Sequence, residues 1–289
     1  MPEALINGVN LYYQVTGRGF PLVWCHEFAG AHESWDLQVK FFSRRYQVIT
    51  YNARGYPPSG VPEDPSAYSQ EQSVEDLYGL LRHLGIRQAH IGGLSMGGNV
   101  ALNFGLTHPA MAKALIVAST GSGTVDRERF LREGAEVARR FEREGMVAMA
   151  EVYAQGPTGV QFLRKDPKGW EEFKKGLAAH SSKGSAYTFR GVITKRPTIF
   201  ALEEKLHALE VPTLIMIGDE DEPCVEPAIF MKRHIPRSGL VVFPQAGHTI
   251  NLEEPDLFNR AVLDFLTAVE ADRWVRRSTV AAAGTLLPR

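Results

Sequence analysis

Short apolar runs that alternate with helix-length segments are the feature that most constrains the fold of this chain. Each run is mostly apolar, as in strands that are buried on both faces of a parallel sheet. After an N-terminal stretch of short strands, the runs lie at 22–25, 46–51, 88–93, 112–119, 212–218 and 239–244. Segments of helical periodicity lie at 34–43, 73–84, 97–108, 226–234 and 254–269. This order predicts an α/β fold with a mostly parallel central sheet flanked by helices.

The alternation is interrupted once, after the sixth strand of the predicted sheet. Residues 121–209 contain no comparable apolar run, and their apolar residues recur at helical spacing. We therefore expect a core of residues 1–120 and 210–270 with an all-helical cap at 121–209. Open α/β sheets bind ligands at the carboxyl ends of their strands, so the cap is interpreted as a lid, with a purely structural subdomain as the alternative. A flexible tail is expected at 278–289.

Composition narrows the range of partners. Hydrophobic residues make up 44% of the chain and charged residues 22%, which are ordinary values for a globular protein. A formal net charge of −1 gives no broad field to attract nucleic acid or an anionic membrane. No apolar run approaches the roughly 18–20 residues that span a bilayer. We therefore expect a small-molecule substrate, with neither nucleic acid nor membrane as a partner, and leave a homodimer open.

Three further features concern the compartment and bound metals. The N-terminus has no basic segment followed by a long apolar stretch, so no signal peptide and a cytoplasmic location are expected. Cys25 and Cys224 are the two cysteines, and they are interpreted as reduced, buried thiols rather than a disulfide. The nine histidines are scattered without metal-ligand spacing, so no metal ion is expected.

The strongest local signal is the sequence Gly-Leu-Ser-Met-Gly-Gly at 93–98. It follows an apolar run directly and opens a helical segment. In a strand–turn–helix context such a tight turn requires small flanking residues, and it pushes the serine hydroxyl out at the top of the sheet. The start of the helix also directs backbone N–H groups and the positive end of its dipole to the same place. Ser95 is therefore predicted to be a nucleophile.

A serine hydroxyl needs a base within hydrogen-bond reach, and an imidazole base needs an acid that holds it in one tautomer. His248 follows the last predicted strand and precedes the final helix, so it should lie at the same carboxyl edge of the sheet. Four acidic residues at 219–222 follow another buried strand. One of them is expected to face His248, while the others form a solvated turn. The resulting order, serine, acid and histidine, is that of α/β-hydrolases.

With these motifs the chain resembles an α/β-hydrolase of the compact esterase, lactonase and perhydrolase type, over nearly its whole length to about Val269. The resemblance implies that Asp221 in the Gly-Asp-Glu-Asp sequence is the acid, with Asp219 as the alternative. The family's Gly-His and Glu-x-Pro-x-x-Phe patterns match the segment from Gly247 to Phe258. The sequence Asn-Ala-Arg-Gly-Tyr stands where an Asp-x-Arg-Gly turn is usual.

An oxyanion hole needs two N–H donors, and the loss of one costs roughly 10²–10³ in rate. The amide of Met96, the residue after the nucleophile, is predicted to be one donor. By resemblance to the family's His-Gly-x loop, the second is the amide of Phe28. Glu27 replaces the usual glycine of this loop. A carboxylate beside an oxyanion is repulsive, so Glu27 is expected to point away and pair with Arg54 or His26; an inward Glu27 would suggest a general acid or base.

The resemblance implies a serine hydrolase that cleaves a small carboxylic ester or lactone through an acyl-enzyme. Ser95 attacks, His248 moves the proton, water deacylates, and no cofactor is required. Leu94 stands where ring-fission C–C hydrolases commonly have asparagine, which favours an esterase or lactonase. A C–C hydrolase, a cofactor-independent oxygenase on the same fold, and a ligand receptor with slow turnover remain as alternatives.

The aromatic residues of the cap are expected to divide between two roles. Some should line an apolar pocket, and half or more should pack the cap onto the core. These residues are Phe141, Tyr153, Phe162, Trp170, Phe173, Tyr187 and Phe189. Arg190 is expected to face water rather than an acidic substrate.

Overall fold

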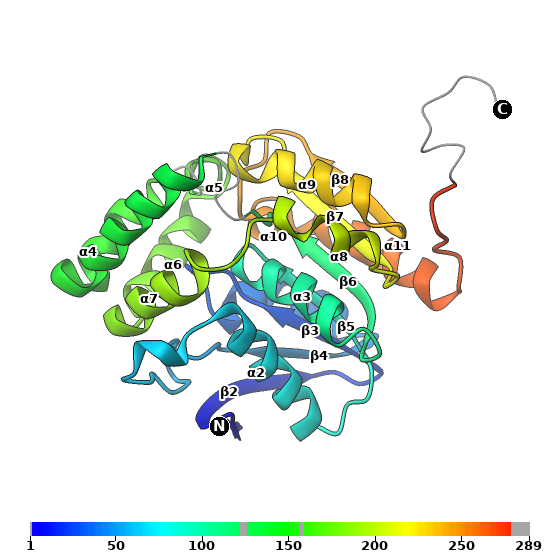
Figure 1. Ribbon diagram of the computed structural model, residues 1–289, viewed down its shortest axis with the longest axis horizontal. Coiled ribbons are helices and arrows are strands. Elements are labelled where there is room, and N and C mark those ends of the chain that lie inside the picture. The colour runs from blue at the N-terminus through cyan, green and yellow to red at the C-terminus, as the bar shows by residue number, and fades with distance from the viewer. Residues whose placement is uncertain (1, 122–125, 157–158, 279–289) are drawn as a thin grey trace.

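A computed structural model describes residues 2–121, 126–156 and 159–278. Within these ranges the chain forms an eight-stranded sheet in the order β1-β2-β4-β3-β5-β6-β7-β8 (Figure 1). β2 pairs antiparallel with both β1 and β4, and every pair from β4 to β8 is parallel. The strands are β1 (Glu3–Ile6), β2 (Val9–Thr16), β3 (Phe20–Cys25), β4 (Tyr46–Tyr51), β5 (Ala89–Leu94), β6 (Ala112–Ala118), β7 (Thr213–Gly218) and β8 (Ser238–Phe243). The predicted mostly parallel sheet is confirmed.

Helices cover both faces of the sheet and create two apolar clusters. Leu77, Phe104 and Met231 belong to the cluster on one face, and Phe42 and Phe258 belong to the cluster on the other. The helices outside the insertion are η1 (His32–Trp35), α1 (Asp36–Phe42), η2 (Pro65–Ala67), α2 (Gln70–His83), α3 (Met96–Thr107), α9 (Glu222–His234), α10 (Ile250–Glu253) and α11 (Pro255–Glu270). Because both faces are covered, the central strands are apolar along nearly their whole length.

Strand β8 departs from this pattern. The sequence predicts that it is buried on both faces, whereas most of its residues are half-buried and Val242 is 52% exposed. β8 lies at the edge of the sheet and pairs only with β7. An edge strand has one neighbour instead of two, so its apolar residues are less completely covered.

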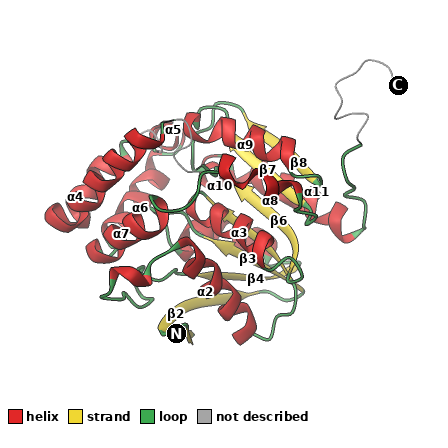
Figure 2. Cartoon of the chain, in the orientation of Figure 1, coloured by secondary structure: helices red, strands yellow, loops and turns green. Residues whose placement is uncertain are grey.

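The segment between β6 and β7 is helical, and its described residues contain no strand. The helices of this segment differ in position: Figure 2 shows the earlier ones grouped to one side of the strands and the last one beside α9. They are α4 (Arg127–Ala154), α5 (Val160–Lys165), α6 (Pro167–Ala178), α7 (Ser182–Thr188), η3 (Phe189–Ile193), η4 (Phe200–Leu202) and α8 (Glu203–His207). α4 packs against α6 and α7 and is broken at Gly145, where φ is 80°. We call the segment from α4 to α8 the helical insertion.

The helical insertion packs on loops at the carboxyl ends of the parallel strands. Phe141 and Phe189 of the insertion share an apolar cluster with Phe28, which follows β3, and with Met96, which follows β5. The aromatic rings of Phe28 and Phe189 meet edge to face with centroids 5.1 Å apart. The insertion therefore covers the edge of the sheet where Ser95 lies.

The structure can be compared with two more predictions, one about a membrane partner and one about the C-terminal tail. No helix among the described residues is long and apolar enough to cross a bilayer. Of the predicted tail at 278–289, everything after Ser278 lies outside the described residues.

Candidate active site

The turn between β5 and α3 holds Ser95 in a backbone conformation that residues other than glycine rarely adopt. Its φ is 55° and its ψ is −110°, and its amide donates to the carbonyl of Ala118 at 2.8 Å. A Cβ at Gly93 would lie 2.2 Å from the Gly97 carbonyl oxygen, and one at Gly97 would lie 2.0 Å from that of Cys25. Both glycines are therefore required by close backbone approaches. Positive φ at a non-glycine residue is strained, and such strain is concentrated at functional sites.

His248 lies against Asp221 in the loop region above β7 and β8. The Nδ1 atom of His248 is 2.8 Å from Oδ2 of Asp221, whose side chain is nearly fully buried. Asp219, the alternative acid, is exposed and accepts a hydrogen bond from the amide of Ala246 at 3.2 Å. The structure thus brings Asp221, and not Asp219, to the imidazole.

The ionisation of His248 reflects these neighbours. Burial alone would lower the pKa of the imidazole, but the charge and hydrogen bond of Asp221 outweigh burial and raise it. Glu27 and Glu253 add to the increase. The bond from Nδ1 to the carboxylate leaves Nε2 as the nitrogen that can accept a proton.

Glu253 holds the loop that carries His248. Its carboxylate accepts hydrogen bonds from the amide of Gly247 at 2.7 Å and from the amide and hydroxyl of Thr249, both at 3.1 Å. The sequence analysis matched this glutamate to a family pattern but gave it no role. The signal available in the sequence was the position of Glu253, five residues after His248 and two before Pro255, where the final helix begins.

The side chain of His26 is turned toward the backbone of its own loop. The Nε2 atom accepts from the amide of Ala53 at 3.0 Å, so Nδ1 carries the proton and donates to the carbonyl of Glu27 at 2.7 Å. Burial lowers the pKa of His26 to about 4. This neutral imidazole fixes the backbone of the loop in which Phe28 lies.

The expectation that Glu27 points away from the site and pairs with Arg54 or His26 is wrong. Arg54 is bound to Asp76, with Nε 2.5 Å and Nη2 2.7 Å from the carboxylate oxygens. Glu27 is 3% exposed, its Oε1 accepts from the Ser34 hydroxyl at 3.0 Å, and its buried Oε2 has no hydrogen-bond partner among the described residues. Burial raises the pKa of its carboxyl.

Glu27 lines the same small cavity as Ser95 and His248. The other lining residues are Phe28, Ala29, Tyr153, Phe173 and Thr249. The free space is about 10 Å³, room for about one water molecule. Tyr153 comes from α4 and Phe173 from α6, so the helical insertion closes the cavity. The remaining predicted oxyanion donor, the amide of Met96, begins α3 directly after Ser95.

The other aromatic residues of the insertion pack elsewhere. Phe141 and Phe189 contact Phe28, while Tyr187 meets the ring of Tyr68. Phe162 and Trp170 belong to a separate apolar cluster. Arg190 forms an ion pair with Glu142 on α4, with Nη2 2.5 Å from Oε2.

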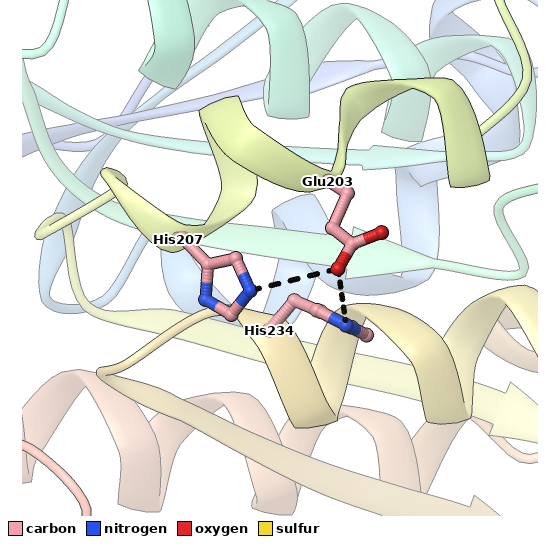
Figure 3. A group of neighbouring side chains, drawn as sticks. All are labelled: Glu203, His207 and His234. Atoms are coloured by element: carbon pink, nitrogen blue, oxygen red, sulfur yellow. Dashed lines mark ion pairs between the residues drawn. The ribbon is translucent and has the colours of Figure 1, made fainter.

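Two groups of metal-ligating residue types come together among the described residues. One consists of Asp221, Cys224 and His248 and is part of the candidate active site. Cys224 is a thiol there, because burial raises its pKa well above the usual value. Figure 3 shows the other group, Glu203, His207 and His234, whose imidazole Nε2 atoms lie 3.9 Å and 3.5 Å from the Glu203 carboxylate. Spacing along the sequence did not reveal this group, because His234 comes from a different helix.

Comparisons with known proteins agree with this fold. Residues 21–255 match the family model of the α/β hydrolase fold. The chain is 29% identical over 229 residues to 3-oxoadipate enol-lactonase 2 of Acinetobacter baylyi, which covers 79% of this chain and 81% of the lactonase.

Solved structures of hydrolases share the fold of this chain. A thermophilic esterase from Thermogutta terrifontis is 29% identical, with a TM-score of 0.83 over 93% of this chain and 98% of the esterase. The enol-lactonase from Burkholderia xenovorans LB400 shares the fold, with a TM-score of 0.81 at 24% identity over 92% of this chain and 100% of the lactonase. On the match across residues 21–255, the chain is an enzyme of the α/β-hydrolase family.

Proposed function

We propose that this enzyme is a serine hydrolase that cleaves a small carboxylic ester or lactone through an acyl-enzyme on Ser95. The observation that carries the proposal is the shared cavity of Ser95 and His248, with His248 bound to the buried Asp221 at 2.8 Å. The names of the relatives support the substrate class, since they include an enol-lactonase and an esterase at 29% identity.

The chemistry of the site proceeds in two proton transfers. Nε2 of His248 accepts the proton of the Ser95 hydroxyl as its oxygen attacks the carbonyl carbon, and Asp221 stabilises the resulting imidazolium. The imidazolium then donates its proton to the leaving alcohol or, in a lactone, to the ring oxygen. Water attacks the acyl-enzyme with His248 again as base, which releases the acid and restores Ser95. None of these steps requires a cofactor.

The oxyanion of each tetrahedral intermediate needs donors on the other side of the carbonyl. The amides of Met96 and Phe28 are assigned to this role. Support comes from the position of Met96 at the start of α3, where the backbone N–H groups and the helix dipole favour negative charge. The loop of Phe28 is fixed by His26 through two backbone hydrogen bonds.

The helical insertion is assigned the role of a lid. A cavity with free space of about 10 Å³ holds no ester, so Tyr153 and Phe173 must move when a substrate enters. Closure over the bound substrate would exclude water from the first step and strengthen the electrostatic interactions of the oxyanion.

A fluorophosphonate probe and a panel of esters and lactones test the proposal. The wild-type enzyme should be labelled at Ser95 and should turn over at least one member of the panel repeatedly. Ser95→Ala should lose labelling and at least about 10³-fold in kcat. Retained activity in Ser95→Ala would refute the mechanism. Tight binding without a burst or turnover would indicate a receptor, and cleavage of C–C bonds or oxygen consumption would indicate the other two alternatives.

A further inference from the structure

A groove on the surface lies directly beside the candidate active site. It has a volume of about 530 Å³ and runs between η1 and α1 of the core and α5 and α6 of the helical insertion. It shares Ala29 and Phe173 with the cavity that contains Ser95. Ala29 and Phe173 therefore border both the groove and the cavity. The groove is the approach that a substrate can take to Ser95.

The walls of this groove are acidic. Glu33, Asp36, Asp166 and Glu172 line it, and Lys40 is its one basic side chain apart from histidine. The carboxylate of Glu33 is paired with His32 at 2.9 Å. Three carboxylates then remain in the groove against the one ammonium group of Lys40.

The histidine of the groove adds no positive charge. His180 also lines it, but burial lowers the pKa of this imidazole to about 3, so it is uncharged at neutral pH. An anion that enters the groove therefore meets a net negative field.

Glu27 continues the row of carboxyl groups from the groove into the cavity. Its Oε1 is held by Ser34, a residue that also lines the groove. A Cβ at position 30 would lie 2.1 Å from Oε1, so Gly30 leaves the space that the carboxyl group occupies. The buried Oε2 has no partner, and the residues that line the cavity include neither lysine nor arginine.

We propose that Glu27 and the acidic groove select the charge of the substrate: the enzyme accepts uncharged and cationic acyl groups and rejects those that carry a carboxylate. This inference rests on the proposed ester or lactone hydrolysis and specifies its substrate class. A substrate carboxylate would lose its hydration in the cavity without a cationic partner. A hydroxyl, an amide or an ammonium group can instead supply the partner that Oε2 lacks.

The test compares three p-nitrophenyl esters that differ in charge at the end of the acyl chain. They are the hexanoate, the hemiglutarate and the γ-trimethylammoniobutyrate. In the wild type, kcat/KM for the hemiglutarate should be lower than for the hexanoate by on the order of 100-fold, while the cationic ester should equal or exceed the hexanoate. Equal rates for the hemiglutarate and the hexanoate would overturn the proposal.

Two variants separate the inner and outer parts of the selection. Glu27→Gln keeps the shape and removes the charge, and it should reduce the preference for hexanoate over hemiglutarate by about tenfold. Glu172→Lys should reduce the preference by about threefold, an effect that added salt weakens because the groove is open to solvent. Glu171→Lys, one position away on α6 and outside the groove lining, is the matched control and should leave the preference as it is. An unchanged preference in both test variants would refute the inference.

A separate measurement keeps this inference distinct from the proposed function. If Ser95→Ala retained activity, the hydrolytic mechanism would fail, whereas the charge preference could still be read as binding. Calorimetric titration of the folded wild type with hexanamide and with glutaramate measures the charge preference as a difference in affinity, without any turnover. Weaker binding of glutaramate, relieved in Glu27→Gln, supports the inference. Equal affinities contradict it, and unfolding curves of each variant show whether the fold is kept.

Discussion

Two loops at the carboxyl edge of the sheet each bury a carboxylate near His248, yet only one of the two carboxylates is fully paired. In the loop after β7, Asp221 accepts from the imidazole at 2.8 Å. In the loop after β3, Glu27 is as deeply buried, but only Oε1 has a partner, the hydroxyl of Ser34. The first loop is complete in the free protein. The second leaves one polar atom that a ligand can satisfy.

This difference has an energetic meaning. A buried oxygen without a hydrogen bond costs about 1–3 kcal/mol, which is a large share of the stability of a typical domain. Arg54, one of the two partners of Glu27 expected from the sequence, is bound to Asp76 instead. Such local conflicts are typical of functional sites, where stability is lost for the sake of activity. In the proposed mechanism the Asp221 loop serves the reaction, and in the proposed charge selection the Glu27 loop serves the choice of substrate.

The largest effect is expected from the paired loop. Asp221→Asn should lower kcat by about 10⁴-fold, because the amide favours the wrong tautomer of His248. Steady-state kinetics on a p-nitrophenyl ester and the rate of fluorophosphonate labelling check this. Asp219→Asn is the matched control, two residues away and exposed, and should change kcat by less than about threefold. A large loss in Asp219→Asn with activity kept in Asp221→Asn would reverse the assignment of the acid.

An intermediate effect links the two loops through the pH dependence of the rate. His248 must be neutral to act as base, and its pKa is raised, so kcat/KM should fall on the acid side with an apparent pKa above the usual 6.5. Glu27 contributes to the increase. Glu27→Gln should therefore shift the acid-side fall of kcat/KM to lower pH. At about pH 6, the ratio of kcat/KM to its value on the high-pH plateau should rise by about twofold. An acid-side fall that does not shift would show that the two loops are electrostatically independent.

The smallest effect is expected in stability. The folded-state pKa of Glu27 is raised by burial. The raised pKa means that folding favours the protonated form of Glu27. The stability that this shift contributes is fully present below the unfolded-state pKa of about 4.3, and it is lost as the pH rises through the folded-state pKa. Above that window Glu27→Gln should be more stable than the wild type by about 1 kcal/mol.

Urea unfolding at about pH 4 and about pH 8 tests this difference. The gain in Glu27→Gln should grow from the lower to the higher pH. Other titrating groups, such as His26, cancel because both proteins contain them. A variant less stable than the wild type at both pH values would show that the carboxyl group is satisfied in solution.

The fold was predictable because its signals are local. Continuous apolar runs indicate buried parallel strands, and the glycines around Ser95 indicate a turn in which backbone atoms approach closely. The structure contains these strands, and a Cβ at Gly93 or Gly97 would lie only 2.0–2.2 Å from a backbone oxygen. Burial of β8 was predicted wrongly, since a sequence does not state which strand lies at the edge of the sheet.

The orientation of Glu27 could not be predicted, because it depends on contacts far apart in the sequence. Arg54 is withdrawn by Asp76, and Phe173 closes the cavity from a helix of the insertion. Neither contact follows a periodicity or a motif. The choice between Asp219 and Asp221 likewise rested on family spacing, and only the position of the imidazole in space distinguishes them.

The closed cavity also has a kinetic consequence. The free protein has room for about one water molecule beside Ser95, so under the proposed lid role ligands bind only the fraction of molecules in which Tyr153 and Phe173 are displaced. The apparent affinity is reduced by that fraction, and the observed association rate reaches a limit at high ligand concentration that equals the rate of opening. The break in α4 at Gly145, eight residues before Tyr153, is where the backbone can absorb this motion. Stopped-flow association would thus measure the lid before any product forms.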